Sequence, residues 1–297
     1  TWDSGHTETP AVIYTAGEYR LYYSATPDAM ADDGGQLRFG LATSPDGVTW
    51  VRNPANPILE RGLPSSWEER QIESPTVLET DSLYYMWYNG LDAEWRIYVG
   101  LATSEDGLSW HKYPGNPVFS PAPHSDWDSV GVYAPQVRIL GDRIVMLYTG
   151  IVFDAAGYDY NNARTGVAVS TDGINWSRAC DRPVLAGTPG AWDAAGPFTL
   201  DWIDTGGQLL MVYMSDWKAG IATSPIDPAG VTAEKDKFPE AHILFPNYPN
   251  PFNSETIIGY RITSFSYVEL IIFDVLGKEV KTLINKTQPP GEYHVHW

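Results

Sequence analysis

The stretch that decides the fold is residues 67–110, WEERQIESPTVLETDSLYYMWYNGLDAEWRIYVGLATSEDGLSW, because most of it occurs again before and after. It opens on a tryptophan and an acidic residue and closes on the phrase Ser-x-Asp-Gly-x-x-Trp. The opening recurs at spacings of 65, 60 and 65 residues, as Trp2-Asp3, Trp67-Glu68, Trp127-Asp128 and Trp192-Asp193. The closing phrase recurs at residues 44–50 and 170–176. A fixed period of this size, filled with short strands, is typical of a propeller or an array.

Each repeat divides into four short strands, which in the first repeat are residues 10–14, 18–25 and 36–43 and the residues around Trp50. The Asp-Gly pair of the closing phrase is a turn signal, because Asp bonds its own backbone and Gly accepts a positive φ. Four-stranded antiparallel units repeated radially make a β-propeller. We therefore expect an all-β chain with a propeller over residues 1–225; a stack or sandwich is the alternative.

The number of repeats is low for a closed propeller. Three repeats are complete and the fourth has a degraded last strand, whereas propellers this small usually need a fifth blade. The chain begins inside a repeat, so we expect it to be a fragment or processed form whose further blade lies upstream. The alternative is a degenerate blade formed by residues 225–245.

A second unit follows the repeats. Residues 226–245 form a linker rich in Pro, Ala, Lys and Glu, and residues 246–297 contain four predicted strands, 256–262, 267–274, 279–283 and 291–297. Hairpin signals separate these strands. We expect a small C-terminal β-sandwich.

Composition excludes several classes of partner. The chain has 37 acidic and 19 basic residues, a formal charge of −18, which argues against nucleic acid and anionic membranes. Its one cysteine, Cys180, excludes an internal disulfide and a cysteine-based zinc site. No run of 18 apolar residues is present, so no membrane span is expected.

Residues that differ between equivalent positions of the repeats are the candidates for function. The acidic residues of the opening and closing phrases recur, so we interpret them as structural. The residue two before the inner-strand proline instead varies, being Glu8, Glu73, Tyr133 and, by alignment, Phe198. All four should lie at the mouth of the central funnel, where two carboxylates beside two aromatic rings suit a sugar.

Glycoside hydrolysis needs a protonated acid and a second carboxylate. Burial and mutual repulsion keep one of two neighbouring carboxyl groups protonated near neutral pH. We predict Glu73 as the general acid and Glu8 as base, nucleophile or modulator of the pKa. The alternative is that both glutamates only form hydrogen bonds on a binding surface.

Further candidates lie in the loops between the second and third strands of each repeat. Trp95, Arg96, Asp216 and Trp217 are predicted to bind substrate, and His6 to bind a sugar hydroxyl or orient Glu8. The same loops contain Asp32, Asp33, Asp92, Asp154, Tyr158, Asp159, Tyr160 and Arg164. A calcium ion held by Asp154, Asp159 and Asn161 is a possible cofactor, and no other cofactor is predicted.

The repeats resemble the five-bladed propeller glycosidases of families 43, 32, 117 and 130. The resemblance rests on the closing phrase, on residues 56–59 and 116–119 (Asn-Pro-[Ile/Val]-[Leu/Phe]), and above all on Glu73-Ser74-Pro75. It implies a five-bladed propeller with Glu73 as the acid. In family 43 an aspartate base lies two blades before the acid, with a pKa-modulating carboxylate between them. Glu8 then occupies the modulator's blade, and the base comes from the further blade or from Asp201 or Asp216.

The C-terminal unit resembles the immunoglobulin-like sorting domain of type IX secretion cargo. The match lies in residues 248–253 (YPNPFN), residues 273–280 (FDVLGKEV) and residues 291–293 (GEY). Such domains run on for another hairpin, so this one is expected to be truncated. The resemblance implies the secretion machinery as a partner, and secretion or cell-surface attachment in a Gram-negative bacterium.

Together these features predict a secreted glycoside hydrolase acting on plant or algal oligosaccharide or polysaccharide. The first alternative is a non-catalytic carbohydrate-binding propeller. The second is a sialidase-like enzyme, because the closing phrase resembles the Asp box, although the arginine triad and the tyrosine nucleophile of sialidases cannot be assembled here. The third is a purely structural surface protein.

Overall fold

The computed structural model describes residues 2–27, 36–80, 83–154, 157–158, 162–205, 208–225, 243–245, 247, 255–262, 266–273, 278–288 and 291–297. Within these ranges the regular elements are β-strands and no α-helix occurs, so the chain is all-β as predicted. The same residues contain no helix long and apolar enough to cross a membrane.

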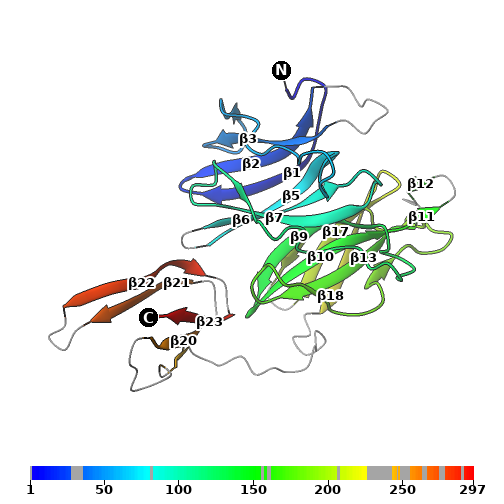
Figure 1. Cartoon of the computed structure of the whole chain (residues 1–297). Coiled ribbons are helices and arrows are strands. Elements are labelled where there is room, and N and C mark those ends of the chain that lie inside the picture. Colours follow the sequence, from blue (N-terminus) through cyan, green and yellow to red (C-terminus); the bar gives the residue numbers. More distant parts are fainter. Residues whose placement is uncertain are drawn as a thin grey trace.

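Four antiparallel units, here called blades 1 to 4, follow one another along the chain (Figure 1). Blades 2 and 3 are joined into one sheet by a parallel bridge between Ile97 of β7 and Gly131 of β9. Blade 1 has β1 (His6–Thr15), β2 (Glu18–Thr26), β3 (Arg38–Ser44) and β4 (Val51–Arg52). Blade 2 has β5 (Gln71–Glu79), β6 (Tyr84–Leu91), β7 (Ile97–Ser104) and β8 (His111–Lys112). Blade 3 has β9 (Gly131–Leu140), β10 (Arg143–Ile151), β13 (Arg164–Ser170) and β14 (Ser177–Arg178). Blade 4 has, among the described residues, β16 (Leu200–Asp204), β17 (Gln208–Ser215) and β18 (Lys218–Pro225).

Three short strands accompany blade 3. β11 (Phe153–Asp154) pairs with β12 (Gly157–Tyr158), and β15 (Leu185–Ala186) pairs with β13.

The blades are arranged radially around their first strands. β5 lies between β1 and β9, and β9 also contacts β16, so each blade presents its first strand to the centre. Within the described residues this series ends at β16, which makes no comparable contact with β1. Among the described residues, the four blades are therefore arranged radially around β1, β5, β9 and β16.

Each blade is held by a cluster around its opening pair. In blade 2, Trp67 packs on Tyr88 with ring centroids 5.8 Å apart, and Tyr88 donates to Glu68 at 3.0 Å. Lys112 Nζ lies 2.6 Å from Glu68 Oε1, and a Cβ on Gly100 would lie 2.3 Å from the Trp67 ring. The same Trp, Tyr and carboxylate meet in the other blades, as Trp2, Tyr23 and Asp3, as Trp127, Tyr148 and Asp128, and as Trp192, Tyr213 and Asp193. The recurring acidic residues are thus structural, as interpreted from the sequence.

The closing phrases form turns that also join neighbouring blades. In blade 2, Ser104 Oγ accepts from the Gly107 N–H at 2.8 Å, and Asp106 Oδ1 accepts from the Leu108 and Ser109 N–H groups at 2.7 and 2.8 Å. Tyr22 of blade 1 donates to the Gly107 carbonyl at 2.9 Å. In the same way Trp87 of blade 2 donates to the carbonyl of Gly173 in blade 3 at 2.8 Å.

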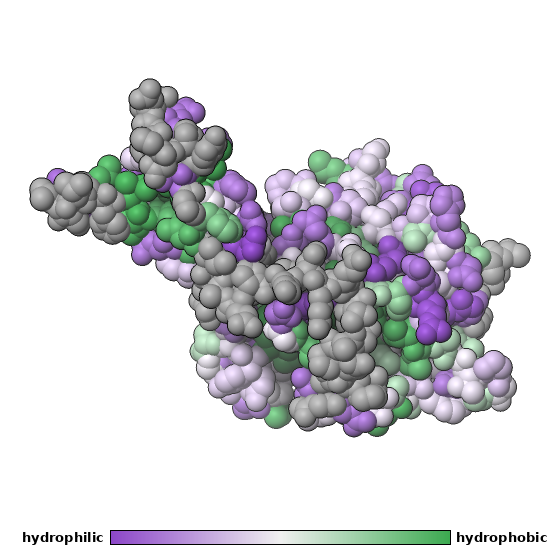
Figure 2. All heavy atoms as spheres, turned by 90° about the horizontal axis from the view of Figure 1, so that it is seen from below, coloured by the Kyte–Doolittle hydropathy of each residue, from purple (hydrophilic) through white to green (hydrophobic). Residues whose placement is uncertain are grey.

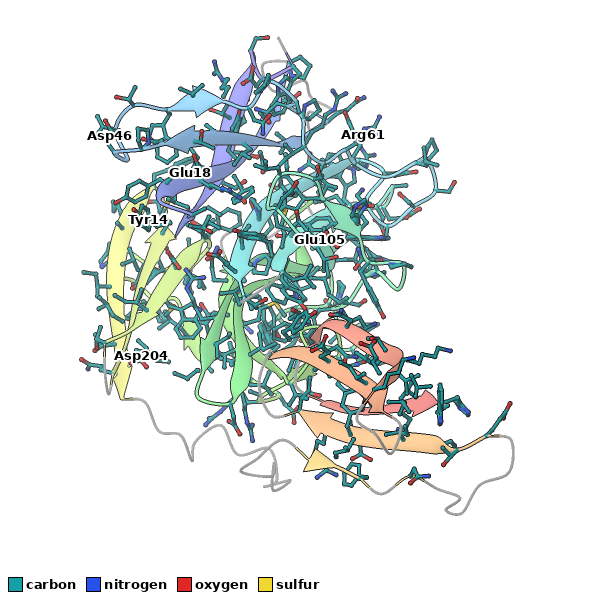
Figure 3. All side chains as sticks on the ribbon, turned by 90° about the vertical axis from the view of Figure 1, so that its left-hand side faces the viewer. Tyr14, Glu18, Asp46, Arg61, Glu105 and Asp204 are labelled. Atoms are coloured by element: carbon teal, nitrogen blue, oxygen red, sulfur yellow. The ribbon has the colours of Figure 1, made fainter. Side chains whose placement is uncertain are left out.

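Apolar cores fill the spaces between successive blades. Tyr22, Trp87 and Trp202 are buried at the successive interfaces between blades 1 and 2, 2 and 3, and 3 and 4. The two ends of the series carry exposed apolar side chains, Val12 and Tyr14 on β1 and Val212, Met214 and Ile221 on β17 and β18. Figure 3 labels Tyr14 on blade 1 and Asp204 on blade 4, the two ends of the series.

The C-terminal unit consists of two small sheets. β19 (Ile243–Leu244), β20 (Ile257–Ile262) and β23 (Gly291–His296) form one, and β21 (Ser266–Phe273) and β22 (Glu279–Gln288) form the other. Figure 2 shows apolar surface on this unit, and Tyr267 and Val280 are among its exposed apolar side chains. Four of these strands match the four predicted ones, with β22 longer than expected. The domain boundaries at 225/226 and 245/246 border residues outside the described set and stay predictions.

Candidate active site

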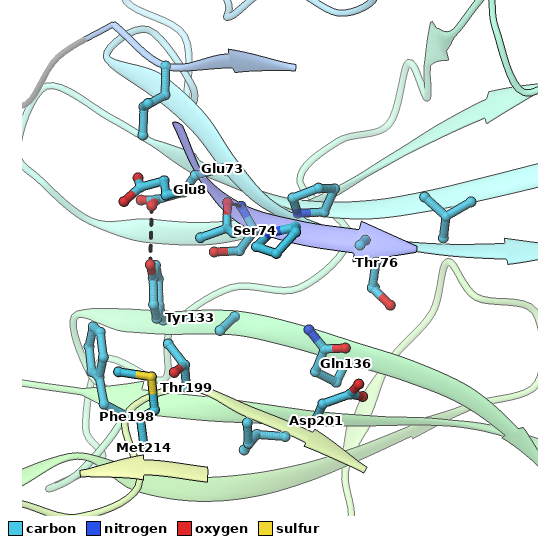
Figure 4. Close-up of a pocket in the computed structure, with 18 of the residues that line it drawn as sticks. Glu8, Glu73, Ser74, Thr76, Tyr133, Gln136, Phe198, Thr199, Asp201 and Met214 are labelled. Atoms are coloured by element: carbon cyan, nitrogen blue, oxygen red, sulfur yellow. Dashed lines mark hydrogen bonds between the residues drawn. The ribbon is translucent and has the colours of Figure 1, made fainter. Parts of the chain in front are cut away.

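A cavity of about 1560 Å³ lies where the inner strands converge (Figure 4). Residues of β1, β5, β9, β16 and β17 line it, so all four blades contribute. The predicted residues that line it are His6, Glu8, Glu73, Trp95, Tyr133, Phe198, Asp216 and Trp217. Arg96 is not among the described lining residues.

A repeated bulge aims the side chains of the inner strands. The residue before each inner-strand proline has a positive φ, 48° at Thr9, 53° at Ser74 and 50° at Ala134. The strand register shifts at the same places. Such a conformation is strained for a residue with a Cβ, and a bulge redirects neighbouring side chains. The residue before each bulge is Glu8, Glu73 or Tyr133, the variable position found in the sequence.

The inner strands of blades 2, 3 and 4 are each held by a buried polar side chain, here called a latch, from the second strand of the blade before. Asn89 Nδ2 donates to the Val132 carbonyl at 2.8 Å, and its Oδ1 accepts from the Ala134 N–H at 2.7 Å. Ser24 lies 2.6 Å from Thr9 Oγ1, which in turn accepts from the Ser74 N–H at 3.1 Å. Thr149 donates to the Phe198 carbonyl. Blades 1, 2 and 3 therefore each fix the inner strand of the blade that follows.

Glu73 is buried at the wall of the cavity and has two hydrogen-bond donors. Gln71 Nε2 lies 2.9 Å from Oε1, and the Tyr133 hydroxyl lies 3.2 Å from Oε2 (Figure 4). Burial, and secondarily the charge of Glu8, raises the pKa of Glu73 from 4.5 to about 7, while the two hydrogen bonds oppose the rise. A carboxyl group with such a pKa can hold and release a proton near neutral pH.

Glu8 lies beside Glu73 but in a more open place. Its side chain is about one-third exposed, and His6 Nε2 lies 2.9 Å from its Oε2. Tyr133 stacks on Phe198, with ring centroids 5.1 Å apart and planes 22° apart. Burial, and then the charge of Glu73, raises the pKa of Tyr133 well above its usual value, so Tyr133 stays a hydrogen-bond donor.

The predicted loop residues have unequal positions. Arg70 lies over the Trp95 ring, its guanidinium carbon 4.0 Å from the centroid. Asp92 shapes this loop, since its Oδ1 accepts from the Glu94 and Arg96 N–H groups at 3.0 and 2.8 Å. Its carboxylate therefore acts on the loop backbone.

Asp216 and Trp217 form the tight turn between β17 and β18. Both have positive φ values, 47° and 60°, as a two-residue hairpin turn requires. The Trp217 side chain is exposed at the cavity rim, and Asp216 Oδ2 lies 3.6 Å from Lys218 Nζ.

Several candidates lie outside the described residues, namely Asp32, Asp33, Asp159, Tyr160 and Asn161, together with the side chains of Asp154 and Tyr158. The calcium prediction depends on three of them and stays a prediction. No group of three metal-ligating side chains occurs in the part of the chain that the structure describes. Arg164 is described and lies opposite Gly150 in the pairing of β13 with β10.

Sequence reasoning missed Gln71 and Arg138. Gln71 has the same offset from Glu73 that His6 has from Glu8, a signal that was available in the repeats. Arg138 pairs with Asp201 at 2.8 Å across blades 3 and 4, and both line the cavity.

Curated relatives match the chain over part of their lengths. An uncharacterised protein of Mycobacterium tuberculosis is 31% identical over 152 residues, which are 50% of this chain and 48% of that protein. A 1,2-beta-oligomannan phosphorylase of Thermoanaerobacter is 25% identical over 198 residues, 65% of this chain and 58% of that protein. The chain thus spans about half the length of the curated relatives it matches.

Solved structures of propeller glycoside hydrolases share the fold. A family 117 glycoside hydrolase of the marine bacterium Zobellia galactanivorans has a TM-score of 0.60 at 16% identity, covering 73% of this chain and 66% of that chain. A family 32 beta-fructofuranosidase of Bombyx mori has a TM-score of 0.58 at 16% identity, covering 90% of this chain and 56% of that chain.

One family model, described as the N-terminal domain of glycosyl hydrolases family 32, matches the chain twice, at residues 8–126 and 82–212. The two matches overlap because the blades repeat, so the same model fits the chain at two positions. Together they span all four described blades up to β17. With the radial blades and the buried glutamate at their centre, this match shows that the chain belongs to the glycosyl hydrolase family 32 N-terminal domain family.

Proposed function

We propose that this protein is a secreted glycoside hydrolase acting on plant or algal oligosaccharide or polysaccharide, with Glu73 as its general acid. The observation that carries the proposal is the raised pKa of Glu73, about 7, in a cavity that a second carboxylate shares. Family membership supports the reaction class, and the aromatic pair Tyr133 and Phe198 supports a sugar as the ligand.

In this reaction protonated Glu73 donates its proton to the glycosidic oxygen as the bond from that oxygen to the sugar carbon breaks. Gln71 and Tyr133 then stabilise the carboxylate that forms, because both donate to it. Glu8 raises the pKa of Glu73 through its charge, which fits the role of a modulator. The glycosyl group is finally transferred to water, which loses a proton to a base.

We further propose that a fifth blade closes the propeller and supplies this base. The exposed apolar faces of blades 1 and 4 support the closure, because the matching faces within the series are buried. Glu8 borders both the cavity and a groove of about 460 Å³ on the outer face of blade 1, so a blade seated there would contact it. Asp201 and Asp216 are the base candidates within the described residues, but Arg138 pairs with Asp201 and Lys218 lies beside Asp216.

For the C-terminal unit we propose the role of a sorting domain recognised by type IX secretion machinery in a Gram-negative bacterium. Its sequence motifs carry this proposal, and its two small sheets are compatible with it. Fusing residues 246–297 to a periplasmic reporter in a host with that machinery tests it. Export of the reporter is expected, and retention in the periplasm would contradict the proposal for these residues.

Aryl glycosides test the catalytic proposal. The panel contains 4-nitrophenyl arabinofuranosides, xylosides, galactosides and mannosides, with the chain, Glu73→Gln and the control Glu105→Gln, whose glutamate is exposed on a turn. We expect Glu73→Gln to lower kcat/KM by about 10³-fold and Glu105→Gln to leave it unchanged. Part of the loss should disappear with 2,4-dinitrophenyl glycosides, because that leaving group needs no proton.

Two results would count against catalysis by Glu73. Equal turnover by Glu73→Gln would remove it as the acid. Binding of sugars without turnover by either folded protein would favour the non-catalytic carbohydrate-binding propeller.

A further inference from the structure

Gln71 has one polar atom without a hydrogen-bond partner in the described part of the chain. Gln71 Nε2 donates to Glu73 Oε1 at 2.9 Å, so the amide nitrogen of Gln71 faces this carboxyl group. The amide oxygen therefore points elsewhere. It is buried and has no hydrogen-bond partner among the described residues.

This unpartnered oxygen belongs to a side chain that lines the cavity beside the acid. The whole of Gln71 is 7% exposed, and its strand partner Leu91 and the nearby Ile97 are apolar residues of the same cavity wall. Buried acceptors are almost always satisfied, because leaving one unpaired costs free energy. Since Gln71 lines the cavity, an occupant of the cavity can supply the missing donor.

In the repeats, a polar residue lies two positions before the variable position wherever that position is a glutamate. The residue two before the variable position is His6 before Glu8 and Gln71 before Glu73, but glycine before Tyr133 and Phe198. His6 and Gln71 both lie 2.9 Å from their carboxylates. The amide of Gln71 adds an acceptor to this arrangement.

We propose that Gln71 Oε1 accepts a hydrogen bond from a hydroxyl group of the sugar whose glycosidic oxygen faces Glu73. Gln71 is then a specificity-determining residue: its Oε1 binds the sugar, and its Nε2 positions the carboxyl group of Glu73. The inference rests on the proposed function for the identity of the ligand as a sugar.

The test compares a glycoside with its monodeoxy forms. The variants are Gln71→Met, which keeps the length of the side chain and removes both polar atoms, and the control Gln208→Met at the exposed start of β17. The probes are the 4-nitrophenyl glycosides of the panel that are turned over, and the methyl glycosides of the same sugars for binding by calorimetry. A melting curve for each variant confirms that it is folded.

In the chain and in Gln208→Met, we expect removal of one particular hydroxyl to cost about tenfold in kcat/KM or in affinity. In Gln71→Met that deoxy glycoside and its parent should become equal. The basic limb of the pH profile should also move to higher pH in Gln71→Met, because the donor that favours ionised Glu73 is gone. A purely structural role would change neither the deoxy preference nor the pH profile.

The possible failures are distinguishable. Binding that depends on Gln71 and on one hydroxyl, without turnover, would sink the catalytic proposal and leave this inference standing. Turnover with a deoxy preference that Gln71→Met leaves intact would overturn the inference, and a water molecule would then satisfy Oε1. Failure of every methyl glycoside to bind the folded chain would overturn it as well.

Discussion

Equivalent apolar side chains are buried between two blades but exposed at the two ends of the blade series. Val77 and Val137, two residues after the inner-strand prolines of blades 2 and 3, are 5% and 0% exposed, but Val12 at the same place in blade 1 is 53% exposed. Leu147, just before the aromatic partner of the opening tryptophan in blade 3, is 7% exposed, and its counterpart Val212 in blade 4 is 46% exposed. A neighbouring blade, and not the residue type, decides whether these positions are buried.

The residues of the candidate site differ in burial in the same way. Glu73 and Tyr133 come from blades 2 and 3, which have neighbours on both sides, and both side chains are buried. Glu8 and the exposed Trp217 come from blades 1 and 4, each with one open face. The carboxyl group with the raised pKa is the one between two neighbours, since burial is the main cause of the rise. Position in the series thus sets the chemistry of otherwise equivalent residues.

The largest effect is expected from truncating the matched pair Leu147 and Val212. Leu147→Ala should lower the free energy of unfolding by roughly 3 to 4 kcal/mol, because it leaves a cavity between blades 3 and 4. Val212→Ala should lower it by about 0.5 kcal/mol, because the side chain is largely in water. Urea unfolding of both variants measures the difference. A cost for Val212→Ala as large as that for Leu147→Ala would mean that another molecule covers this face in solution.

The next effect concerns ionisation of the buried glutamate. Folded Glu73 keeps its proton up to about pH 7, whereas the unfolded carboxyl group loses it near pH 4.5, so between these values the folded state binds more protons. The free energy of unfolding must therefore fall as the pH rises through this window. Across it Glu73→Gln should gain on the order of 3 kcal/mol relative to the unchanged chain, since one pKa unit corresponds to about 1.36 kcal/mol.

Unfolding of both proteins at pH 4 and pH 8 provides the measurement. At pH 4 the two should be nearly equal, and at pH 8 Glu73→Gln should be the more stable. A constant difference at both pH values would show that the folded carboxyl group titrates normally. Glu8→Gln should weaken the pH dependence, because the charge of Glu8 contributes to the raised pKa of Glu73.

The smallest expected effect is the difference in stability between alanine substitutions at two glycines that share a backbone conformation. Gly47 and Gly173 occupy the same place in the closing turns of blades 1 and 3, with φ of 73° and 72°. A Cβ on Gly173 would lie 2.6 Å from the buried Trp87 ring, whereas one on Gly47 would come no closer than 3.5 Å to Tyr19. Gly47→Ala should cost about 1 kcal/mol for its backbone alone, and Gly173→Ala about 2 kcal/mol or more. Thermal unfolding checks both, and equal costs would argue against the tight contact with Trp87.

Much of the fold and part of the site followed from the repeats. Because repeats of one length place equivalent residues at equivalent radii, the alignment of Glu8, Glu73, Tyr133 and Phe198 was enough to predict that they share a cavity. The structural interpretation of the recurring acidic residues followed from the same logic.

Features that depend on backbone conformation or on tertiary contacts could not be predicted from the sequence. The bulges at Thr9, Ser74 and Ala134 need a positive φ in residues that rarely adopt it, which no propensity favours. Asp92 was a candidate for the pocket, but its carboxylate accepts from the N–H groups of its own loop. The role of Gln71 depends on which of its two amide atoms faces Glu73, and a sequence does not contain that information.

The latches at Ser24, Asn89 and Thr149 have a consequence for how such a chain can grow. Blades 1, 2 and 3 each carry on the second strand the group that holds the next inner strand, and blades 2 and 3 also carry a bulge that is held from the blade before. A gene duplication that copies one such blade therefore copies both a latch and a bulge that a latch can hold. Met214 stands in blade 4 where the latch stands in the others, so a duplicated blade placed after it would meet a side chain unable to donate a hydrogen bond. If the chain arose by duplication of blades, the inner blades should be interchangeable and the blades at the two ends should be specialised.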